Sequence, residues 1–523
     1  MKELIKNYRG VGLFGMVFGG LLYAMLMAQQ LTNTYDGLWN GNVYHAGAQE
    51  LSLGRWLLEY VDNFTRGIHA EPIGALLTLA LFTLGFILLL ELFRVENKKV
   101  GGLALALFLS APLISNTLSY RFTALGYSVS FALAILALFA AVRVRHPALA
   151  ILLGGLALAA SMGAYQTYLG AFCTAAVFYV FYLCYCGTKA QETAYRPLFG
   201  GIFRIAGTAL AGGGLYLAIL SLLLRTNGVA MSGHNGANAI TPMGLLSGLP
   251  DTLAQTYHYF SFYFFGDRLK ISALADTGIF YLLFAALFGL VLYLCVRSAR
   301  RQKWQIPVLV VFAAALPIAC SAYMLVAGNK LELQMTGGLA LVLPLTALMA
   351  FALLSHRALR TAAAVVCGLF LYGNILQVWT DQQAMYEGRN ACVTMATQIV
   401  DDLREEELLS PDYQYYFVGV PARNEMFSVS AAFPAANGYA QFGNFWVSGM
   451  CNQMSYHGLV SKYMGLKLPM AYLGYDDLAA SYPVDEMAAF PKEGYIDRLD
   501  ERTVLIKISP QETYADYETY YRS

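Results

Sequence analysis

The sequence predicts a polytopic α-helical membrane protein that ends in a small α/β domain. Hydrophobic residues make up 58% of the 523 residues and charged residues only 13%, whereas soluble domains carry about 25% charged residues. Apolar runs recur up to residue 380, and about 20 such residues cross the hydrocarbon core of a bilayer. Beyond residue 380 charged residues return, which indicates a separate domain over 381–523.

Eleven apolar segments are predicted to span the membrane. The first follows the basic stretch MKELIKNYRG, and we expect it to be a retained span because no convincing cleavage motif follows it. The predicted spans are residues 11–30, 73–92, 100–115, 123–142, 147–163, 167–186, 205–224, 275–296, 306–327, 338–355 and 361–380.

The basic residues orient these spans. If the N-terminus is cytoplasmic, every cytoplasmic segment is basic, as the positive-inside rule requires. An odd number of spans then places residues 381–523 outside the cytoplasm. The cytoplasmic segments hold Lys2, Lys6, Arg9, Arg94, Lys98, Lys99, Arg143, Arg145, Lys189, Arg196, Arg204, Arg297, Arg300, Arg301, Lys303, Arg357 and Arg360, and the outer loops hold only Arg55, Arg66, Arg121, Arg225, Arg268, Lys270 and Lys330.

Two outer loops are long enough to hold interfacial helices. In the first loop, residues 31–72, the segment Val43–Val61 has an apolar stripe with charged residues off it, which is typical of a helix in the interface plane. The second loop, residues 225–274, begins with the Gly/Asn-rich piece SGHNGANA and continues into PMGLLSGLPDTLAQTYHYFSFYFF, a second candidate for such a helix.

Residues 381–523 read as a small extracytoplasmic α/β domain. We expect a helix over about 384–408, a strand over 413–420, a helix over about 452–464, and a hairpin formed by 495–498 and 503–508. Cys392 and Cys451 both fall in this domain, where disulfides can form. Their separation in sequence does not establish a bridge.

Several function classes find no support in the sequence. A net charge of +1 implies no bulk attraction to nucleic acid, and no P-loop, GxGxxG fingerprint, zinc spacing or GxSxG elbow occurs. No cofactor is predicted, and dependence on a divalent metal stays open. The spans contain almost no ionisable residues, which counts against an ion-coupled transporter.

Three short motifs occur in order on the predicted outer side. They are Asp36 in TYDGLWN after the first span, Gly54-Arg55-Trp56 in the first outer loop, and Tyr165-Gln166 in SMGAYQTYLGA. In this order and topology the chain resembles the bacterial integral-membrane glucosyltransferases that include the serotype-converting enzymes, with GT-C architecture. The family often has two adjacent acids after the first span, whereas here Tyr35 precedes Asp36.

The resemblance implies an inverting glycosyltransferase. Its donor would be a hexose, most simply glucose, on a polyprenyl phosphate such as undecaprenyl phosphate. Its acceptor would be a cell-surface glycan or lipid-linked intermediate at the outer face of the cytoplasmic membrane. Asp36 is the first candidate for the general base. Glu50 and Asp62 are weaker candidates, because their helix can point them toward water.

The resemblance and the chemistry of the side chains assign the other candidates. Arg55 and Arg121 would bind the donor phosphate, since a guanidinium forks onto phosphate oxygens. The alternative for both arginines is snorkelling to the interface. Sugar or acceptor contacts would come from Trp39, Tyr165 and Gln166, and weaker candidates for the phosphate are Arg225 and Lys270.

Two other functions stay open from the sequence. A lipid-linked glycan flippase or transporter would need a hydrophilic cavity among the spans, and few residues are present to line one. A surface-polysaccharide polymerase or ligase would move the main catalytic loops toward the middle or end of the chain.

The predicted orientation can be tested by thiol labelling. A cysteine introduced at Ser410 should react with an impermeant thiol reagent in spheroplasts, because that position is predicted to be outside, and a cysteine at Lys98 should not react. The reverse labelling pattern would exclude this orientation.

Overall fold

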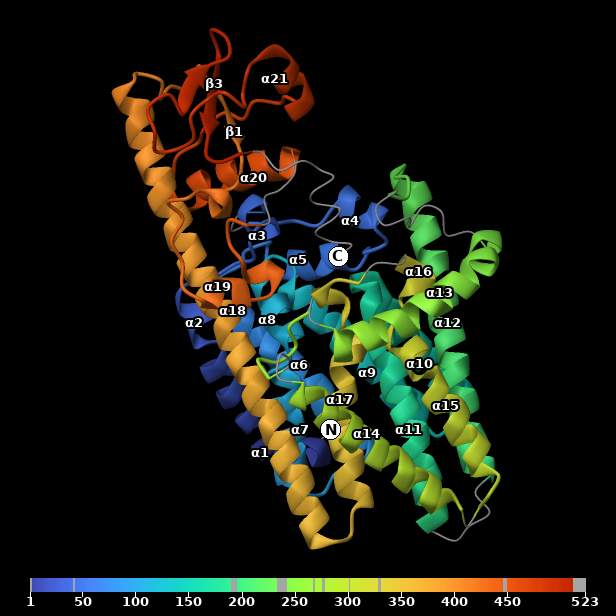
Figure 1. The fold of residues 1–523 in the computed structure, drawn as a ribbon. Helices are drawn as coiled ribbons and strands as arrows, with labels where there is room; N and C mark the ends of the chain where they lie inside the picture. The colour runs from blue at the N-terminus through green and yellow to red at the C-terminus, as the bar shows by residue number, and fades with distance from the viewer. Residues whose placement is uncertain are drawn as a thin grey trace. The chain divides into compact units, whose positions relative to one another are not determined.

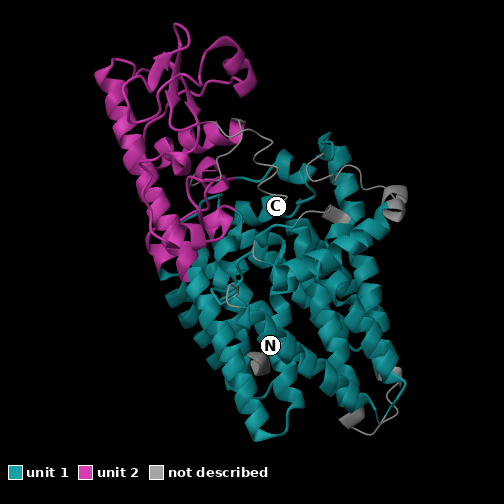
Figure 2. Ribbon diagram, in the orientation of Figure 1, with its two compact units in different colours: residues 1–24, 45–118, 123–378 teal, residues 25–44, 119–122, 379–523 magenta. Residues whose placement is uncertain are grey.

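The computed structural model of the protein is mostly helical and divides into two compact units (Figure 2). Unit 1 holds residues 1–24, 45–118 and 123–378, and unit 2 holds residues 25–44, 119–122 and 379–523. The structure describes residues 2–40, 43–189, 195–232, 242–266, 269–274, 278–300, 302–327, 331–444 and 449–510. The Gly/Asn-rich start of the second long outer loop, residues 233–241, lies outside this range.

Unit 1 is a bundle of apolar helices (Figure 1). Its long helices follow continuous apolar sequence, since an α-helix satisfies its backbone polar groups internally. Its helices are α1 (Lys2–Leu22), α4 (Ala48–Ser52), α5 (Leu58–Phe64), α6 (Ile73–Leu92), α7 (Lys98–Leu109), most of α8 (Pro112–Ser119), α9 (Ala124–Arg143), α10 (Pro147–Ala164), the 3₁₀ turn η1 (Gln166–Tyr168), α11 (Leu169–Lys189), α12 (Tyr195–Asn227), α13 (Pro242–Phe265), α14 (Ile279–Ala299), α15 (Gln305–Cys320), α16 (Met324–Ala327), η4 (Leu333–Met335), α17 (Gly337–Leu353) and the first part of α18 (Arg357–Glu405).

Each of the eleven predicted spans falls on helical structure. Among the described residues, seven helices are long and apolar enough to cross a membrane, and the bent pair α7–α8 can count as an eighth. The helices α15 and α17 are apolar but shorter. The chain therefore has the helices of a membrane protein, while the count of eleven spans stays a prediction.

Two predicted spans are not single straight helices. The segment predicted as 100–115 is split into α7 and α8, which meet at 52°, and Pro112 begins the second helix because proline suits the first turn of a helix. The segment predicted as 306–327 is interrupted after Cys320, and α16 follows as a separate short helix.

Aromatic side chains form part of the core of unit 1. The rings of Phe82 and Phe131 lie 5.3 Å apart, and those of Phe108 and Phe131 lie 4.9 Å apart. Tyr168 packs against the same cluster, with 5.8 Å between its ring and that of Phe131. The three helices α6, α7 and α9 are thereby packed together beneath the turn η1.

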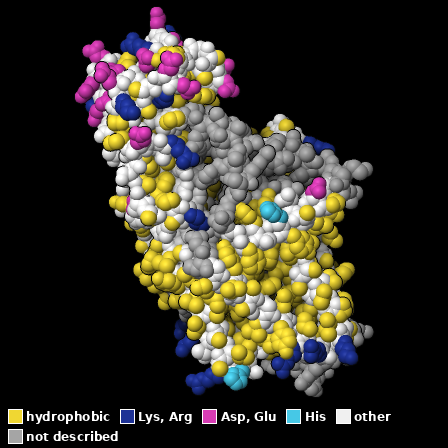
Figure 3. Space-filling view, viewed as in Figure 1, with side chains coloured by type: hydrophobic (Ala, Val, Ile, Leu, Met, Phe, Trp, Pro, Cys, Tyr) yellow, Lys and Arg dark blue, Asp and Glu magenta, His cyan; other side chains and the backbone are white. Residues whose placement is uncertain are grey.

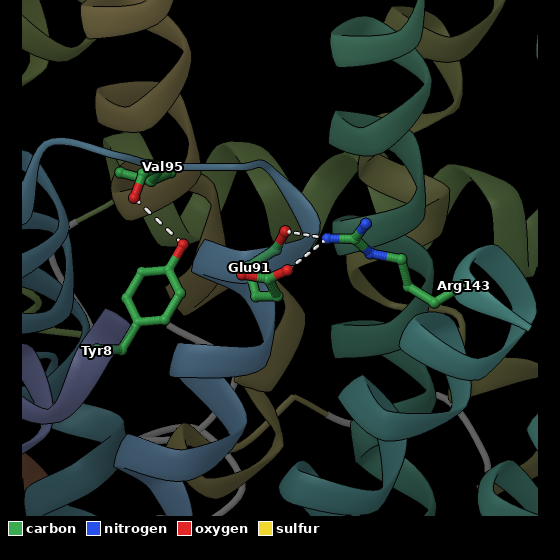
Figure 4. A network of polar contacts seen from close by, with 4 residues as sticks. All are labelled: Tyr8, Glu91, Val95 and Arg143. Carbon is green, nitrogen blue, oxygen red and sulfur yellow. Dashed lines mark hydrogen bonds and ion pairs between the residues drawn. The ribbon is translucent and has the colours of Figure 1, made fainter. Parts of the chain in front are cut away.

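A polar pair joins α6 to α9 at the ends predicted to be cytoplasmic (Figure 4). Arg143 donates to the carboxylate of Glu91 at 2.7 Å and to the Glu91 carbonyl at 2.9 Å. Nearby, the hydroxyl of Tyr8 donates to the carbonyl of Val95. Glu91, the acidic residue near the end of α6, is thus paired with an arginine.

The surface of unit 1 is apolar in its middle. In Figure 3 hydrophobic side chains cover the visible face of the helices, and lysine and arginine side chains gather at the end that holds the loop between α17 and α18. This distribution agrees with a segment of the protein that lies in a membrane.

Unit 2 contains a three-stranded sheet with the strand order β1–β3–β2. The strand β1 (Gln414–Val418) pairs in parallel with β3 (Thr503–Lys507), and β2 (Ile496–Arg498) pairs antiparallel with β3. The expected strand and hairpin are therefore confirmed. Helical segments of this unit are most of α2 (Ala24–Ala28), α3 (Asp36–Trp39), the later part of α18, η5 (Pro421–Arg423), α19 (Ala432–Ala435), η6 (Gly438–Ala440), α20 (Gly449–Leu459), the π-helical turn η7 (Val460–Met464) and α21 (Tyr475–Ser481).

The helix expected over 384–408 is not a separate element. It is the continuation of the last predicted span, and the two form the single helix α18 of 49 residues. Helix-forming sequence continues between the two predicted elements, and neither proline nor glycine interrupts residues 374–387.

Part of the first outer loop belongs to unit 2. Leu38 is buried in the same apolar core as Ile399, Tyr456 and Ile506, which come from α18, α20 and the sheet. The same core encloses Cys392, and both Cys392 and Cys451 are free thiols.

Candidate functional site

Arg55 lies on a stack of tyrosines at one end of unit 1. Its guanidinium sits over the ring of Tyr165, 4.9 Å from the centroid. The ring of Tyr127, from α9, is stacked on that of Tyr165 at 4.0 Å, and the ring of Tyr168 lies 6.1 Å from it. Because Tyr165 is buried, its ring serves as a fixed platform that attracts the cation.

Gln166 holds the loop that carries Arg55. Its side-chain amide donates to the carbonyl of Leu53 at 2.6 Å and to the hydroxyl of Tyr216 at 3.0 Å. That hydroxyl in turn donates to the carbonyl of Gly54. Both N–H bonds of the Gln166 amide are therefore used to position this loop.

Gly54 has a backbone conformation that favours glycine. Its φ is +81°, and a Cβ at this position would overlap the hydroxyl of Tyr216 and lie 2.6 Å from the amide nitrogen of Gln166. The left-handed turn at Gly54 separates α4 from α5. The single interfacial helix predicted over Val43–Val61 is therefore wrong, and two short helices flank the turn.

Trp56 anchors the same loop to α10. A Cβ on Gly163 would overlap the indole ring, and the backbone N–H of Leu57 donates to the Gly163 carbonyl at 2.7 Å. Trp56 thus packs against the end of a helix, which agrees with a structural role.

Glu332 is a carboxylate near this group that the sequence did not single out. It precedes η4 and interacts electrostatically with Tyr165. Arg55, which carries the opposite charge, also interacts with Tyr165. The side-chain amide of Gln334 donates to its carboxylate. The site in unit 1 therefore combines Arg55, Glu332 and tyrosine hydroxyls.

Glu50 and Asp62 are buried, although the sequence also allowed their helix to point them toward water. Their exposed fractions are 9% and 4%. Each carboxylate accepts a backbone hydrogen bond from the start of α4, Glu50 from Gly47 at 2.8 Å and Asp62 from Ala46 at 3.0 Å. The two acids therefore fold the loop, because they satisfy neighbouring amides that would otherwise be unpaired.

Asp36 starts the short helix α3 in unit 2, and the preceding loop is fixed. Thr32, Asn33 and Thr34 are buried. The side chain of Asn33 accepts from the N–H of Gly37 at 2.7 Å, and the hydroxyl of Thr32 donates to the Ser119 carbonyl at 3.1 Å. Asp36 itself is partly exposed, so a reactant in water can reach this residue.

Arg121 lies in unit 2 with Asp36. Its guanidinium donates to the carbonyl of Gln30 at 3.4 Å. Lys462 lies close to both candidates, because its ammonium donates to the carbonyl of Gly37 at 2.7 Å and interacts electrostatically with Arg121. The lysine was not predicted, and its burial depends on tertiary packing that local sequence does not reveal.

The remaining candidates differ in their surroundings. Trp39 is 49% exposed, so its ring is open to a sugar. Arg225 is exposed in the last turn of α12, about 14 Å along the helix from Tyr216, where a cation complements the helix dipole. Lys270 is partly buried beyond the end of α13. Within the described part of the chain, no group of three or more His, Cys, Asp or Glu residues could hold a metal ion.

Comparison with known proteins gives one match. Residues 39–352 match the family model described as glucosyl transferase GtrII. The matched range contains Arg55, Arg121, Tyr165, Gln166 and Glu332, and it begins just after Asp36. No curated protein matches the chain.

Replacing Gly54 with alanine should destabilise unit 1. A left-handed conformation costs a non-glycine residue about 1–2 kcal/mol, and the added methyl group also displaces Tyr216. The thermal melting temperature of Gly54→Ala in detergent should fall below that of the wild type. Gly213→Ala is the matched control, since this glycine lies within α12 and a Cβ there meets nothing within 4 Å. Equal melting temperatures for both variants would contradict the assigned role of Gly54.

Asp62 should make stability depend on pH. Burial raises the pKa of this carboxyl group from 3.8 to about 7, the hydrogen bond from Ala46 opposes the rise, and the nearby Glu50 adds to it. Between these two values the folded protein binds more protons than the unfolded chain, so stability should fall as the pH rises through this window.

The measurement is the melting temperature at several pH values from 4 to 8. Asp62→Asn should flatten the fall across that window, while Glu59→Gln, an exposed acid on the same helix, should keep the wild-type profile. An unchanged slope in Asp62→Asn would show that another group controls the pH dependence.

Proposed function

The chain belongs to the glucosyl transferase GtrII family, and we propose that it transfers glucose from a polyprenyl phosphate to a cell-surface glycan or related acceptor. Membership implies a glucosyltransferase. The observation that carries the proposal is the family match, which extends from the first outer loop through α17. The donor, the acceptor and the side of the membrane are parts of the proposal.

The proposed reaction takes place at the outer face of the cytoplasmic membrane. The apolar helices and the basic loops at one end support an orientation with a cytoplasmic N-terminus and an extracytoplasmic domain at 381–523. A donor carried on a lipid phosphate holds its reactive carbon at the membrane surface. The sugar–phosphate bond is already activated, so the reaction needs no nucleotide on that side.

The proposed chemistry is a single displacement with inversion. The acceptor hydroxyl attacks the anomeric carbon, its proton passes to the carboxylate of Asp36, and the bond from the anomeric carbon to the phosphate oxygen breaks. The polyprenyl phosphate leaves with the bonding electrons. A phosphate is a good leaving group, so no strong general acid is required.

The environment of Asp36 supports its assignment as the base. The residue follows the first helix closely, which keeps it near the membrane surface. The hydrogen bonds of Thr32 and Asn33 fix the loop before it, and a fixed base needs little reorganisation in the transition state. Asp36 is also partly exposed, as an acceptor from solution requires.

Arg55 and Arg121 are proposed to bind the donor phosphate. The ring of Tyr165 packs against the Arg55 guanidinium, and the Gln166 amide binds the carbonyl of Leu53 beside the Gly54 turn. We assign Tyr165 and Gln166 to positioning Arg55, because the ring of one and the amide of the other are already engaged. Trp39 is the residue best suited to stack on a sugar, since half of its surface is exposed.

No observation on the described residues favours a flippase, a transporter or a polymerase. The charged candidates in unit 1 gather at helix ends and loops, and the helices contribute almost exclusively apolar side chains. This arrangement supports chemistry at a membrane surface over passage through the membrane.

Asp36→Asn should lower turnover by about 10²–10⁴-fold, because it keeps the shape of the side chain and removes the base. The assay incubates purified protein with a panel of polyprenyl-phosphate sugars and an acceptor glycan, and it measures release of polyprenyl phosphate. Donor affinity should survive. Asp476→Asn, an exposed acid on α21, is the control, and near-normal turnover by Asp36→Asn would exclude Asp36 as the base.

A further inference from the structure

Two cationic side chains of unit 2 lie close to Tyr463, and a third belongs to the residue before it. Lys462 precedes it in the π-helical turn η7. Arg389 of α18 places its guanidinium 5.8 Å from the centroid of the Tyr463 ring. Arg121 lies close enough to lower the pKa of the Tyr463 hydroxyl, as Arg389 does, although burial raises that pKa to about 12 overall.

The hydroxyl of Tyr463 is buried and, among the described residues, has no hydrogen-bond partner. A buried polar group without a partner costs free energy comparable to a lost hydrogen bond. A hydroxyl beside cations is suited to donate to an anion. The unsatisfied atom and the nearby charges therefore point to the same type of ligand.

The position of Lys462 is determined by close packing. A Cβ on Gly458 of α20 would lie 2.7 Å from the carbonyl of Leu38, so α20 contacts α3 directly. One turn farther along, the ammonium of Lys462 reaches the Gly37 carbonyl. Burial and the nearby Arg121 lower the pKa of Lys462 to about 7, and a bound anion would offset both effects. Turns of π-helix are also frequent at functional sites.

The two arginines have a structural role that must be distinguished from ligand binding. Arg389 donates to the carbonyl of Gln29 at 2.6 Å and Arg121 to that of Gln30. These carbonyls follow α2, where helix carbonyls lack intrahelical partners. This capping accounts for the arginines alone, and it explains neither Lys462 nor the Tyr463 hydroxyl.

We propose that Lys462, Arg121 and the Tyr463 hydroxyl form a phosphate-binding site in unit 2, next to the helix that carries Asp36. The inference rests on the proposed function for its ligand, which is the phosphate of the lipid-linked sugar. The guanidinium supplies a forked contact and the ammonium a point charge. Arg389, on the same tyrosine, adds to the positive potential.

The site gives the C-terminal domain a part in donor binding. Lys462 contacts the residue that directly follows Asp36, so phosphate and base can act on the same sugar. Loss of the lipid phosphate from the site would complete each turnover.

The test is direct binding to the full-length protein in detergent. Citronellyl phosphate, a short prenyl phosphate, is titrated calorimetrically into wild-type protein, Lys462→Gln and Tyr463→Phe. Glutamine can still donate to Gly37 but carries no charge, and phenylalanine lacks only the hydroxyl. Each variant should bind at least about tenfold more weakly, the loss expected for one hydrogen bond to a charged group.

Controls separate charge from folding and lipid phosphate from free phosphate. Lys467→Gln, an exposed lysine in the same segment, should bind as the wild type does, and Lys462→Arg should retain most of the affinity at an unchanged melting temperature. Citronellol should not bind at this site. Inorganic phosphate that bound as tightly as citronellyl phosphate would overturn the assignment to a lipid-linked ligand.

Equal affinities for wild-type protein, Lys462→Gln and Tyr463→Phe would overturn the site and leave the arginines as helix caps. That failure is distinct from failure of the proposed function, which is measured as release of polyprenyl phosphate by the wild-type protein. Loss of citronellyl phosphate binding in Lys462→Gln supports the site even in a preparation that turns over no donor.

Discussion

Burying a charge or an unpaired backbone amide in apolar surroundings costs free energy. This constraint determines where polar and charged side chains lie in this chain. Burying an amide or hydroxyl without a partner costs about 2–7 kcal/mol, and an ion costs more. The apolar helices of unit 1 therefore carry few ionisable side chains in their middle. Arg143 pairs with Glu91, and Arg55 lies on Tyr165. The candidate catalytic and phosphate-binding groups lie in loops, which other interactions must hold in place.

The loops are held in place by side chains that form hydrogen bonds with backbone atoms. Gln166 binds the carbonyl of Leu53, Asp62 binds the amide of Ala46, and Asn33 binds the amide of Gly37. A polar residue at such a position resembles a ligand-binding residue in sequence, because both roles need the same functional groups. The structure separates the two roles, since an amide that already makes two hydrogen bonds has few left for a sugar.

The helical fold was predictable because apolar length is a local property. The boundaries of α6 agree with the predicted span at both ends, and the hairpin of β2 and β3 followed from alternating residues around a turn. The break at Gly54 was not predicted. A glycine among good helix formers does not by itself indicate a left-handed turn, and the neighbouring Tyr216 is far away in sequence. The burial of Glu50 and Asp62 was also not predicted, because it depends on tertiary packing. Likewise Lys462 and Glu332 belong to candidate sites through tertiary packing, whereas Asp36 and Arg55 stood in motifs and Arg121 in a short predicted loop.

The Glu91–Arg143 pair has a consequence at the opposite end of the bundle. Arg143 and Tyr127 lie on the same helix, 16 residues and about 24 Å apart, and Tyr127 is the ring beneath Tyr165. An α-helix is stiff over that length. The Glu91–Arg143 pair therefore also fixes the position of Tyr127 along the axis of α9. A change that loosened the Glu91–Arg143 pair would therefore be expected to shift the tyrosine platform from a distance. The end of unit 1 that holds the Glu91–Arg143 pair is thus mechanically linked to the end that holds Arg55.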